Sequence, residues 1–519
     1  MIALVSELSG ANIACVIALL VLLKISYESL FSPLKDFPGP FVAKYTDIWR
    51  SVVAASGQVD KTNLRWHRTY GTAVRIGPNT ISISDPNLIR TIYATKTNWL
   101  KSDMYRPNDV LIHGQRISNL FNTQDVAWHN KFMKPIRGLW TMTKVLEVEP
   151  LVDETLNKFV SKLGDKFSNG TKSNICPMDE WLGYFAWDVT ANISFGRHYG
   201  FIDQEKDVDN LITDSTKGLY YFAAISQIPW ADYLLDKNPL VRIGPKPTLT
   251  GVAYTFDVVG AYQQELARRG DKPGRAAHYL DRYIAIKEDS AARGADLAVD
   301  DTQVVNWLML NILAGGDTTS ATMRAVVYFL SKAPAARARL QAELDAARLP
   351  LPAQWRDASK LPYLDAVVRE AMRHLPGLAM VLERVVPEGG LMLPDGRLVP
   401  AGTKVGINPA VTNHDAEVFG ENVDEFDPGR WLKRDDESED GFAARLRRMK
   451  DVVEFTFGGG NRMCLGRNMA QLEIYKLFAT LYSLYDIKLV NPDHQWKIHN
   501  AWFIYQWDMP MTIEPRQRV

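Results

Sequence analysis

The sequence predicts one large, mainly α-helical domain with small β-sheets, preceded by an N-terminal apolar helix. Apolar residues recur at helical spacing through most of residues 145–290, and one long helix of about 32 residues is expected to begin near residues 300–303. Short β-like runs at 73–76 and 81–84 flank a Gly-Pro-Asn turn and predict a hairpin. With 519 residues, 46% of them hydrophobic, the chain can bury a sizeable core.

Charge and cysteine content exclude two classes of protein. Lysine plus arginine equals aspartate plus glutamate at 60 each, so no global field points to nucleic acid. The three cysteines, Cys15, Cys176 and Cys464, are too few for a disulfide framework and suit a reducing compartment.

Residues 1–31 are predicted to be a membrane anchor. The apolar run Ile13–Leu23 is shorter than the roughly 20 residues of a full span, unless residues 8–10 are included and Lys24 reaches the interface. A cleavable signal peptide is the alternative. It is disfavoured because Glu7 precedes the run and no small-residue cleavage site follows it. Basic residues after the run predict that the bulk of the chain faces the cytosol. A proline-rich hinge, residues 32–40, then leads to the globular domain, residues 41–519.

One cysteine lies in a glycine-rich loop, residues 457–466, directly before a predicted helix, Arg467–Tyr485. The helix N-terminus favours a thiolate at Cys464, and glycines let a flat ligand approach the main chain. Such a thiolate suits a haem iron. A lone cysteine is otherwise most often a small core residue.

The loop matches Phe-x-x-Gly-x-Arg-x-Cys-x-Gly at every fixed position, and it resembles the haem-binding loop of the cytochromes P450. The resemblance implies that haem b binds here with Cys464 as the axial ligand of the iron. The matching residues are Phe457, Gly460, Arg462, Cys464 and Gly466.

The long helix carries Ala-Gly-Gly-Asp-Thr-Thr at residues 314–319. The two glycines are unfavourable in a helix, and Thr318 can bond back to the carbonyl of Ala314, so the segment predicts a groove where a ligand approaches the backbone. A simple helix break is the alternative. The segment is similar to the oxygen-activation motif of the same family, which implies that Asp317 and Thr318 relay protons to bound oxygen.

The resemblance also implies roles for two further sets of residues. Glu370 and Arg373 share one helix face, and the family pattern joins them to Arg430 in a buried, structural charge triad. Contacts to the haem propionates are implied for Arg384, Trp128 and a basic residue near it. The family places that base four residues after the tryptophan, where this chain has Phe132, so Lys131 or Lys134 would substitute. Trp128 as a plain core residue is the alternative.

The resemblance covers the chain from Pro38 onward and is strongest to fungal microsomal members similar to pisatin demethylase. It implies a monooxygenase of secondary metabolism that oxidises a hydrophobic small molecule, of terpenoid or polyketide type, at the endoplasmic reticulum membrane. By the same resemblance, residues 206–250 would cover the substrate channel. A turn near Trp507–Asp508, between two predicted strands, is also expected to reach the pocket.

No dinucleotide-binding glycine motif follows a predicted strand, so electrons from NADPH must come through a separate protein. NADPH-cytochrome P450 reductase is the implied partner, with cytochrome b5 as an additional candidate donor, and the basic segment 443–450 could receive it. Two other classes stay open: a haem-thiolate isomerase or dehydratase, and a non-enzymatic haem protein that binds or senses ligands.

Overall fold

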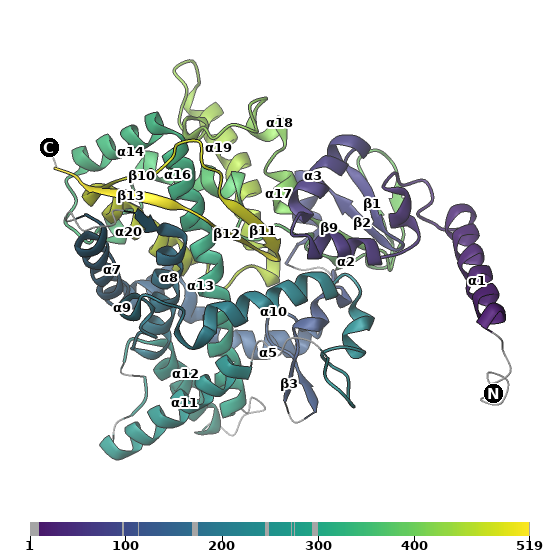
Figure 1. The fold of residues 1–519 in the computed structure, drawn as a ribbon, viewed down its shortest axis with the longest axis horizontal. Helices are drawn as coiled ribbons and strands as arrows, with labels where there is room; N and C mark the ends of the chain where they lie inside the picture. The colour runs from purple at the N-terminus through teal and green to yellow at the C-terminus, as the bar shows by residue number, and fades with distance from the viewer. Residues whose placement is uncertain are drawn as a thin grey trace.

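The computed structural model describes residues 10–95, 98–112, 114–168, 175–243, 249–270, 272–274, 276–292 and 299–517. Figure 1 shows a mainly helical body with small sheets, from which the N-terminal helix α1 projects. The longer helices are α1 (Gly10–Leu30), α3 (Val59–Tyr70), α5 (Val126–Arg137), α7 (Glu149–Leu163), α8 (Met178–Phe195), α10 (Leu211–Ile225), α11 (Leu249–Arg269), α12 (Tyr279–Ala292), α13 (Asp301–Lys332), α14 (Pro334–Ala347), α16 (Pro362–His374), α19 (Glu439–Val453) and α20 (Arg467–Leu484).

The predicted long helix is α13, and it forms the centre of the fold. Its N-terminus is capped by Asp300, whose carboxylate accepts from the backbone of Gln303 at 2.8 Å. It packs against α8, α16 and α20, and their buried apolar faces form one continuous core. Any side chains of α13 that line a site are therefore held on a rigid, closely packed helix.

The described residues form five small sheets around this core. The predicted hairpin is confirmed, because β1 (Ala73–Gly77) pairs antiparallel with β2 (Thr80–Ile83). It extends into the order β1-β2-β9-β6; the other sheets are β10-β13-β5, β11-β12, β3-β4 and β7-β8. The remaining strand bounds are β3 Val110–Ile112, β4 Gln115–Ile117, β5 Ile175–Pro177, β6 Arg384–Val385, β7 Leu391–Met392, β8 Leu398–Val399, β9 Lys404–Ile407, β10 Tyr485–Leu489, β11 Lys497–Ala501, β12 Phe503–Trp507 and β13 Pro510–Pro515.

The C-terminal hairpin differs from the prediction. The tight turn between paired strands lies at Trp502, with φ of +78°, and joins β11 to β12. Residues 507–509 instead lead from β12 into β13, which pairs with β10 and β5 in another sheet. It is therefore Trp502, and not the segment at Trp507–Asp508, that reaches the central cavity.

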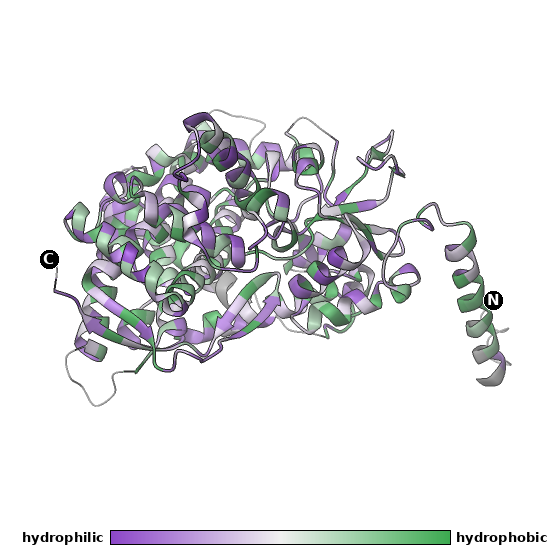
Figure 2. Cartoon of the chain, turned by 90° about the horizontal axis from the view of Figure 1, so that it is seen from above, coloured by the Kyte–Doolittle hydropathy of each residue, from purple (hydrophilic) through white to green (hydrophobic). Residues whose placement is uncertain are grey.

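At the N-terminus, no helix of the described residues is both long and apolar enough to cross a membrane. The spanning anchor predicted for residues 1–31 is therefore not confirmed, and residues 1–9 lie outside the described part of the chain. The apolar run does lie in α1, but this helix continues through Lys24 to Glu28, which forms a 2.6 Å ion pair with the buried Arg75. The C-terminal end of α1 is thus tied to the globular body (Figures 1 and 2).

Candidate active site

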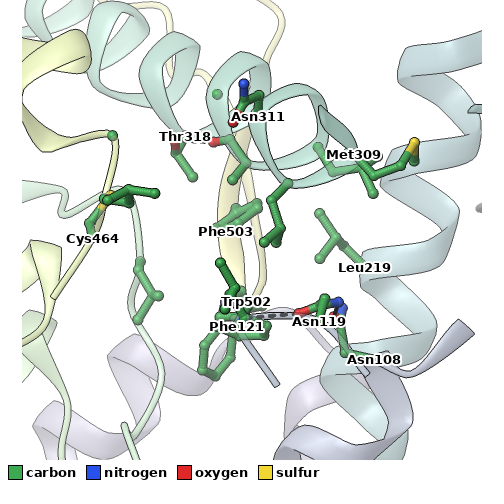
Figure 3. Close-up of a pocket in the computed structure, with 18 of the residues that line it drawn as sticks. Asn108, Asn119, Phe121, Leu219, Met309, Asn311, Thr318, Cys464, Trp502 and Phe503 are labelled. Carbon is green, nitrogen blue, oxygen red and sulfur yellow. Dashed lines mark hydrogen bonds between the residues drawn. The ribbon is translucent and has the colours of Figure 1, made fainter. Parts of the chain in front are cut away.

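A cavity of about 440 Å³ lies beside the middle of α13. One wall is the face of α13 from Thr302 to Thr322, and another is the predicted cysteine loop, 457–466. Residues 206–250 were predicted to cover the substrate channel, and Leu219 and Phe222 of α10, within that segment, line the cavity. Residues 244–248 lie outside the described part of the chain. Figure 3 shows Cys464 and Thr318 at one side of this cavity.

The loop presents Cys464 to the cavity instead of packing it into the core. Its backbone N–H donates to the carbonyl of Phe457 at 2.7 Å, which closes the loop. Gly460 has φ of +60°, and a Cβ there would lie 2.3 Å from the carbonyl oxygen of Tyr93. Gly460 therefore shapes the loop and is not among the cavity-lining residues, whereas Phe457 and Gly466 are.

Two opposing effects act on the Cys464 thiol. Burial raises its pKa, while backbone N–H groups of Gly466 and Arg467 and the charge of Arg467 lower it. In the protein alone burial dominates, so the predicted preference for a thiolate from the helix N-terminus is outweighed. A bound iron would supply the missing positive charge, because a coordinating thiol is deprotonated by its metal.

A group of cationic side chains lines the same cavity, two of them buried and Arg462 half-buried. Arg384 is 5% exposed and Lys101 is 7% exposed, and Arg462 extends from the cysteine loop to the carbonyl of Leu120 at 3.2 Å. Burial and the neighbouring arginines lower the pKa of Lys101 well below its usual value, and burial and Arg384 lower that of Arg462 to about 10. None of these three cations forms an ion pair with a carboxylate of the described residues.

Such uncompensated buried charge is costly, so it implies an anionic ligand. A thiol on one wall and three cations nearby fit a haem, whose iron would take Cys464 and whose propionates would take Lys101, Arg384 and Arg462. Sequence reasoning missed Lys101, because the segment between Trp99 and His113 has no periodicity from which to place it.

Helix α5 presents a different face from the one predicted. Trp128 is half-buried against Phe132, at 4.8 Å between ring centroids, and Lys131 is exposed; neither lines the cavity. These positions do not support propionate contacts by Trp128 and Lys131, which stay a prediction. His129 and Met133 face the cavity instead, and their i, i+4 spacing was the available signal. Burial, together with the charge of Arg462, lowers the pKa of His129 to about 4.

In α13, Thr318 lines the cavity and donates to the carbonyl of Ala314 at 2.5 Å, as predicted. The two glycines before Thr318 have a second role, in helix packing, besides letting a ligand approach the backbone. A Cβ on Gly316 would meet the Trp187 ring at 2.7 Å, and one on Gly315 would meet Thr190 at 2.9 Å. The glycine pair therefore allows α8 and α13 to pack closely, and only Gly315 of the two also lines the cavity.

Asp317 is buried and does not line the cavity. Its carboxylate accepts from Trp187 at 3.0 Å, Ser215 at 3.0 Å and Tyr505 at 2.8 Å. Burial raises the pKa of Asp317, and these three donors oppose the rise. Ser215 itself lines the cavity, so it connects the buried carboxylate with the cavity edge.

Away from the cavity, the structure brings Glu370, Arg373 and Arg430 together. Arg373 donates to both carboxylate oxygens of Glu370, at 2.8 and 2.9 Å, and Arg430 donates at 3.0 Å. Trp431 adds a fourth side-chain bond at 2.8 Å. Burial opposes ionisation of Glu370, but hydrogen bonds from His374 and Arg373 and the charges of both arginines hold its pKa well below the usual range.

Comparison with known proteins agrees with this geometry. Residues 51–512 match the family model described as Cytochrome P450. The chain is 34% identical to the cytochrome P450 monooxygenase cfoH of Aspergillus candidus, over 97% of this chain and 92% of that protein. It is 36% identical to the cytochrome P450 monooxygenase mpaDE' of Penicillium brevicompactum over 96% of this chain, which spans 57% of that longer protein.

The chain belongs to the cytochrome P450 family, and it is a haem-dependent monooxygenase. When bound, the haem-thiolate supplies the oxygen-activating chemistry. This chain would supply the thiolate of Cys464 and a group of cationic side chains to hold the haem, and it provides a largely apolar cavity and a hydroxyl at Thr318.

Proposed function

We propose that this monooxygenase acts in fungal specialised metabolism and uses haem b to oxidise a C–H bond of a hydrophobic terpenoid or polyketide. The observation that carries the proposal is that Cys464 and Thr318 line one cavity whose remaining walls are largely apolar. Similarity to monooxygenases of Aspergillus and Penicillium supports the metabolic setting.

The chain's own residues would manage protons in this reaction. The Thr318 hydroxyl faces the cavity, and Asp317 reaches the cavity edge through Ser215. Burial raises the pKa of Asp317, so its carboxyl group would retain a proton more readily. Thr318 and Ser215 would then hold the hydroxyls through which that proton reaches the cavity.

Electrons would come from NADPH through a separate reductase, with cytochrome b5 as an additional donor. Helix α19 ends immediately before residues 454–457, which lead into the cysteine loop. Arg447 and Arg448 of this helix are exposed and offer a cationic contact for an acidic donor protein close to that loop.

The same proposal places the protein at the endoplasmic reticulum membrane, with the globular body on the cytosolic side. Helix α1 exposes a group of apolar side chains to solvent, which is unfavourable unless something covers them. These are Val16, Leu19, Leu20, Val21, Leu22, Leu23, Tyr27 and Leu30.

The most direct test of the activity is expression in a host that lacks this chemistry, together with a reductase. Candidate terpenoids and aromatic polyketides would be fed, and oxygenated products sought by mass spectrometry. Products heavier by one oxygen atom, formed only with NADPH and O2, are expected. Product formation without reductant would indicate an isomerase or dehydratase instead.

A further inference from the structure

Three asparagines, Asn108, Asn119 and Asn306, line the cavity, and Figure 3 shows Asn108 and Asn119 at the side of it away from Cys464. The amide of Asn119 donates to Oδ1 of Asn108 at 3.0 Å, and the amide of Asn306 donates to the carbonyl of Ser118 at 3.1 Å. Oδ1 of Asn119 is occupied by backbone N–H groups of residues 121 and 122. We define Asn108, Asn119 and Asn306 as the asparagine group.

This group leaves two hydrogen-bonding functions open. Nδ2 of Asn108 donates to no described residue, and Oδ1 of Asn306 accepts from none. Neither side chain is fully buried, and both line the cavity, so one free donor and one free acceptor are available there.

One member of the asparagine group, Asn306, lies on the same helix as Thr318. Asn306 precedes Thr318 by twelve positions along α13, which corresponds to about 18 Å. Between them the cavity face of the helix is mostly apolar, with Met309, Leu310 and Leu313, and Asn311 is a polar exception. Opposite this stretch, Phe121 and Trp502 meet edge to face at 5.6 Å between ring centroids.

The nearby charges do not favour an anionic ligand at this end. Lys237 and Arg242 line the cavity, but both donate to Asp236, at 2.5 and 2.7 Å. A carboxylate would meet the acceptor Oδ1 of Asn306 and find the cations already paired. A hydroxyl both donates and accepts, and it carries no charge.

We propose that the substrate is an elongated, mostly apolar molecule with a hydroxylated end that binds the asparagine group. Its hydroxyl oxygens accept from Asn108 and its O–H donates to Asn306, which directs the opposite, apolar end toward Cys464 and Thr318. This inference rests on the proposed function and adds to it the class of substrate and the end at which it is oxidised.

The test compares dodecane-1,2-diol with dodecane by equilibrium dialysis against the haem-loaded protein. Asn108→Leu and Asn306→Leu should each weaken diol binding about tenfold, because each removes one hydrogen bond, and change dodecane binding by less than about twofold. Asn157→Leu, the same substitution at an exposed position of α7, is the control and should change neither. Equal losses for both probes, no loss in either variant, or failure of the wild type to bind the diol would overturn the proposal.

Product analysis separates this inference from the proposed function. With a reductase and NADPH, the wild type should oxidise the diol at the carbons farthest from its hydroxyls, and Asn306→Leu should scatter the position of oxidation. Oxidation at random positions in the wild type would overturn the inference while leaving the monooxygenase intact. Absence of the haem-thiolate signature would instead contradict the function itself.

Discussion

The hydroxyl of Tyr505 donates a 2.8 Å hydrogen bond to the carboxylate of Asp317, which ties the C-terminal hairpin to the middle of α13. Both residues are buried, and this hydrogen bond opposes the rise that burial causes in the pKa of Asp317. The carboxylate of Asp317, which is expected to transfer protons, thus accepts a hydrogen bond from a strand residue 188 positions later in the chain.

Tyr505→Phe should raise the pKa of Asp317 further, because it removes a donor to the charged form. Because the proposed path needs the protonated form of Asp317, the alkaline limb of the pH–rate profile should move to higher pH, and product formation should persist to higher pH than in the wild type. Tyr482→Phe is the matched control, since the buried Tyr482 hydroxyl has no partner among the described residues. An unchanged profile in Tyr505→Phe would remove Asp317 from the proton path.

Thr318→Ala should separate electron consumption from product formation. The hydroxyl lines the cavity, so its loss should leave NADPH consumption within about twofold while product per NADPH falls about tenfold and hydrogen peroxide rises. Thr318→Ser keeps a hydroxyl and should retain most of the coupling. Full coupling in the alanine variant would mean that Thr318 serves only its bond to Ala314.

Glu370→Ala should destabilise the protein by about 3–5 kcal/mol, because it leaves two buried arginines without their carboxylate. Thermal unfolding monitored by circular dichroism measures the loss. Lys144→Ala breaks an exposed ion pair with the same i, i+3 spacing and should cost within about 1 kcal/mol. Similar melting temperatures for both variants would show that the triad adds no more than a surface pair.

The wild-type protein should also lose stability in acid through Glu370. Its pKa is depressed in the folded state, so its contribution is fully present above the unfolded value of about 4.3 and is lost as pH falls below it. Unfolding titrations from pH 6 to pH 3 should show this decline. In Glu370→Gln the decline should be shallower, and an identical decline in both proteins would contradict the assignment.

Deletion of residues 1–24 tests the role of α1 without removing Glu28, the partner of Arg75. The truncated protein should move from the membrane pellet to the supernatant, because the exposed apolar side chains of α1 up to Leu23 are gone. Haem content should be unchanged. If the truncated form stayed in the pellet, another surface would be responsible for membrane binding.

Sequence patterns predicted the elements that depend on local chemistry. The long helix α13, the β1–β2 hairpin and the helix after Cys464 were placed correctly because their periodicity, caps and turn residues are local signals. Side-chain direction was harder to predict. Trp128 and His129 are neighbours, and only the packing of α5 decides that His129 faces the cavity.

Residues whose role depends on tertiary contacts could not be predicted from sequence patterns. Lys101 lies in a segment without periodicity, and the partners of Asp317 come from α8, α10 and β12. The turn at Trp502 was misplaced by a few residues, because β12 and β13 look like one strand pair in sequence but belong to different sheets.

The central claim is that Cys464 is the thiolate ligand of a haem, and the spectrum of the reduced protein with carbon monoxide tests it most directly. The wild type and Cys15→Ala, a variant of the exposed cysteine on α1, should both show the red-shifted Soret band of a thiolate-ligated haem. Cys464→Ala should lose that band while its far-ultraviolet circular dichroism still reports a folded, mainly helical protein. Retention of the red-shifted band in Cys464→Ala would contradict the account.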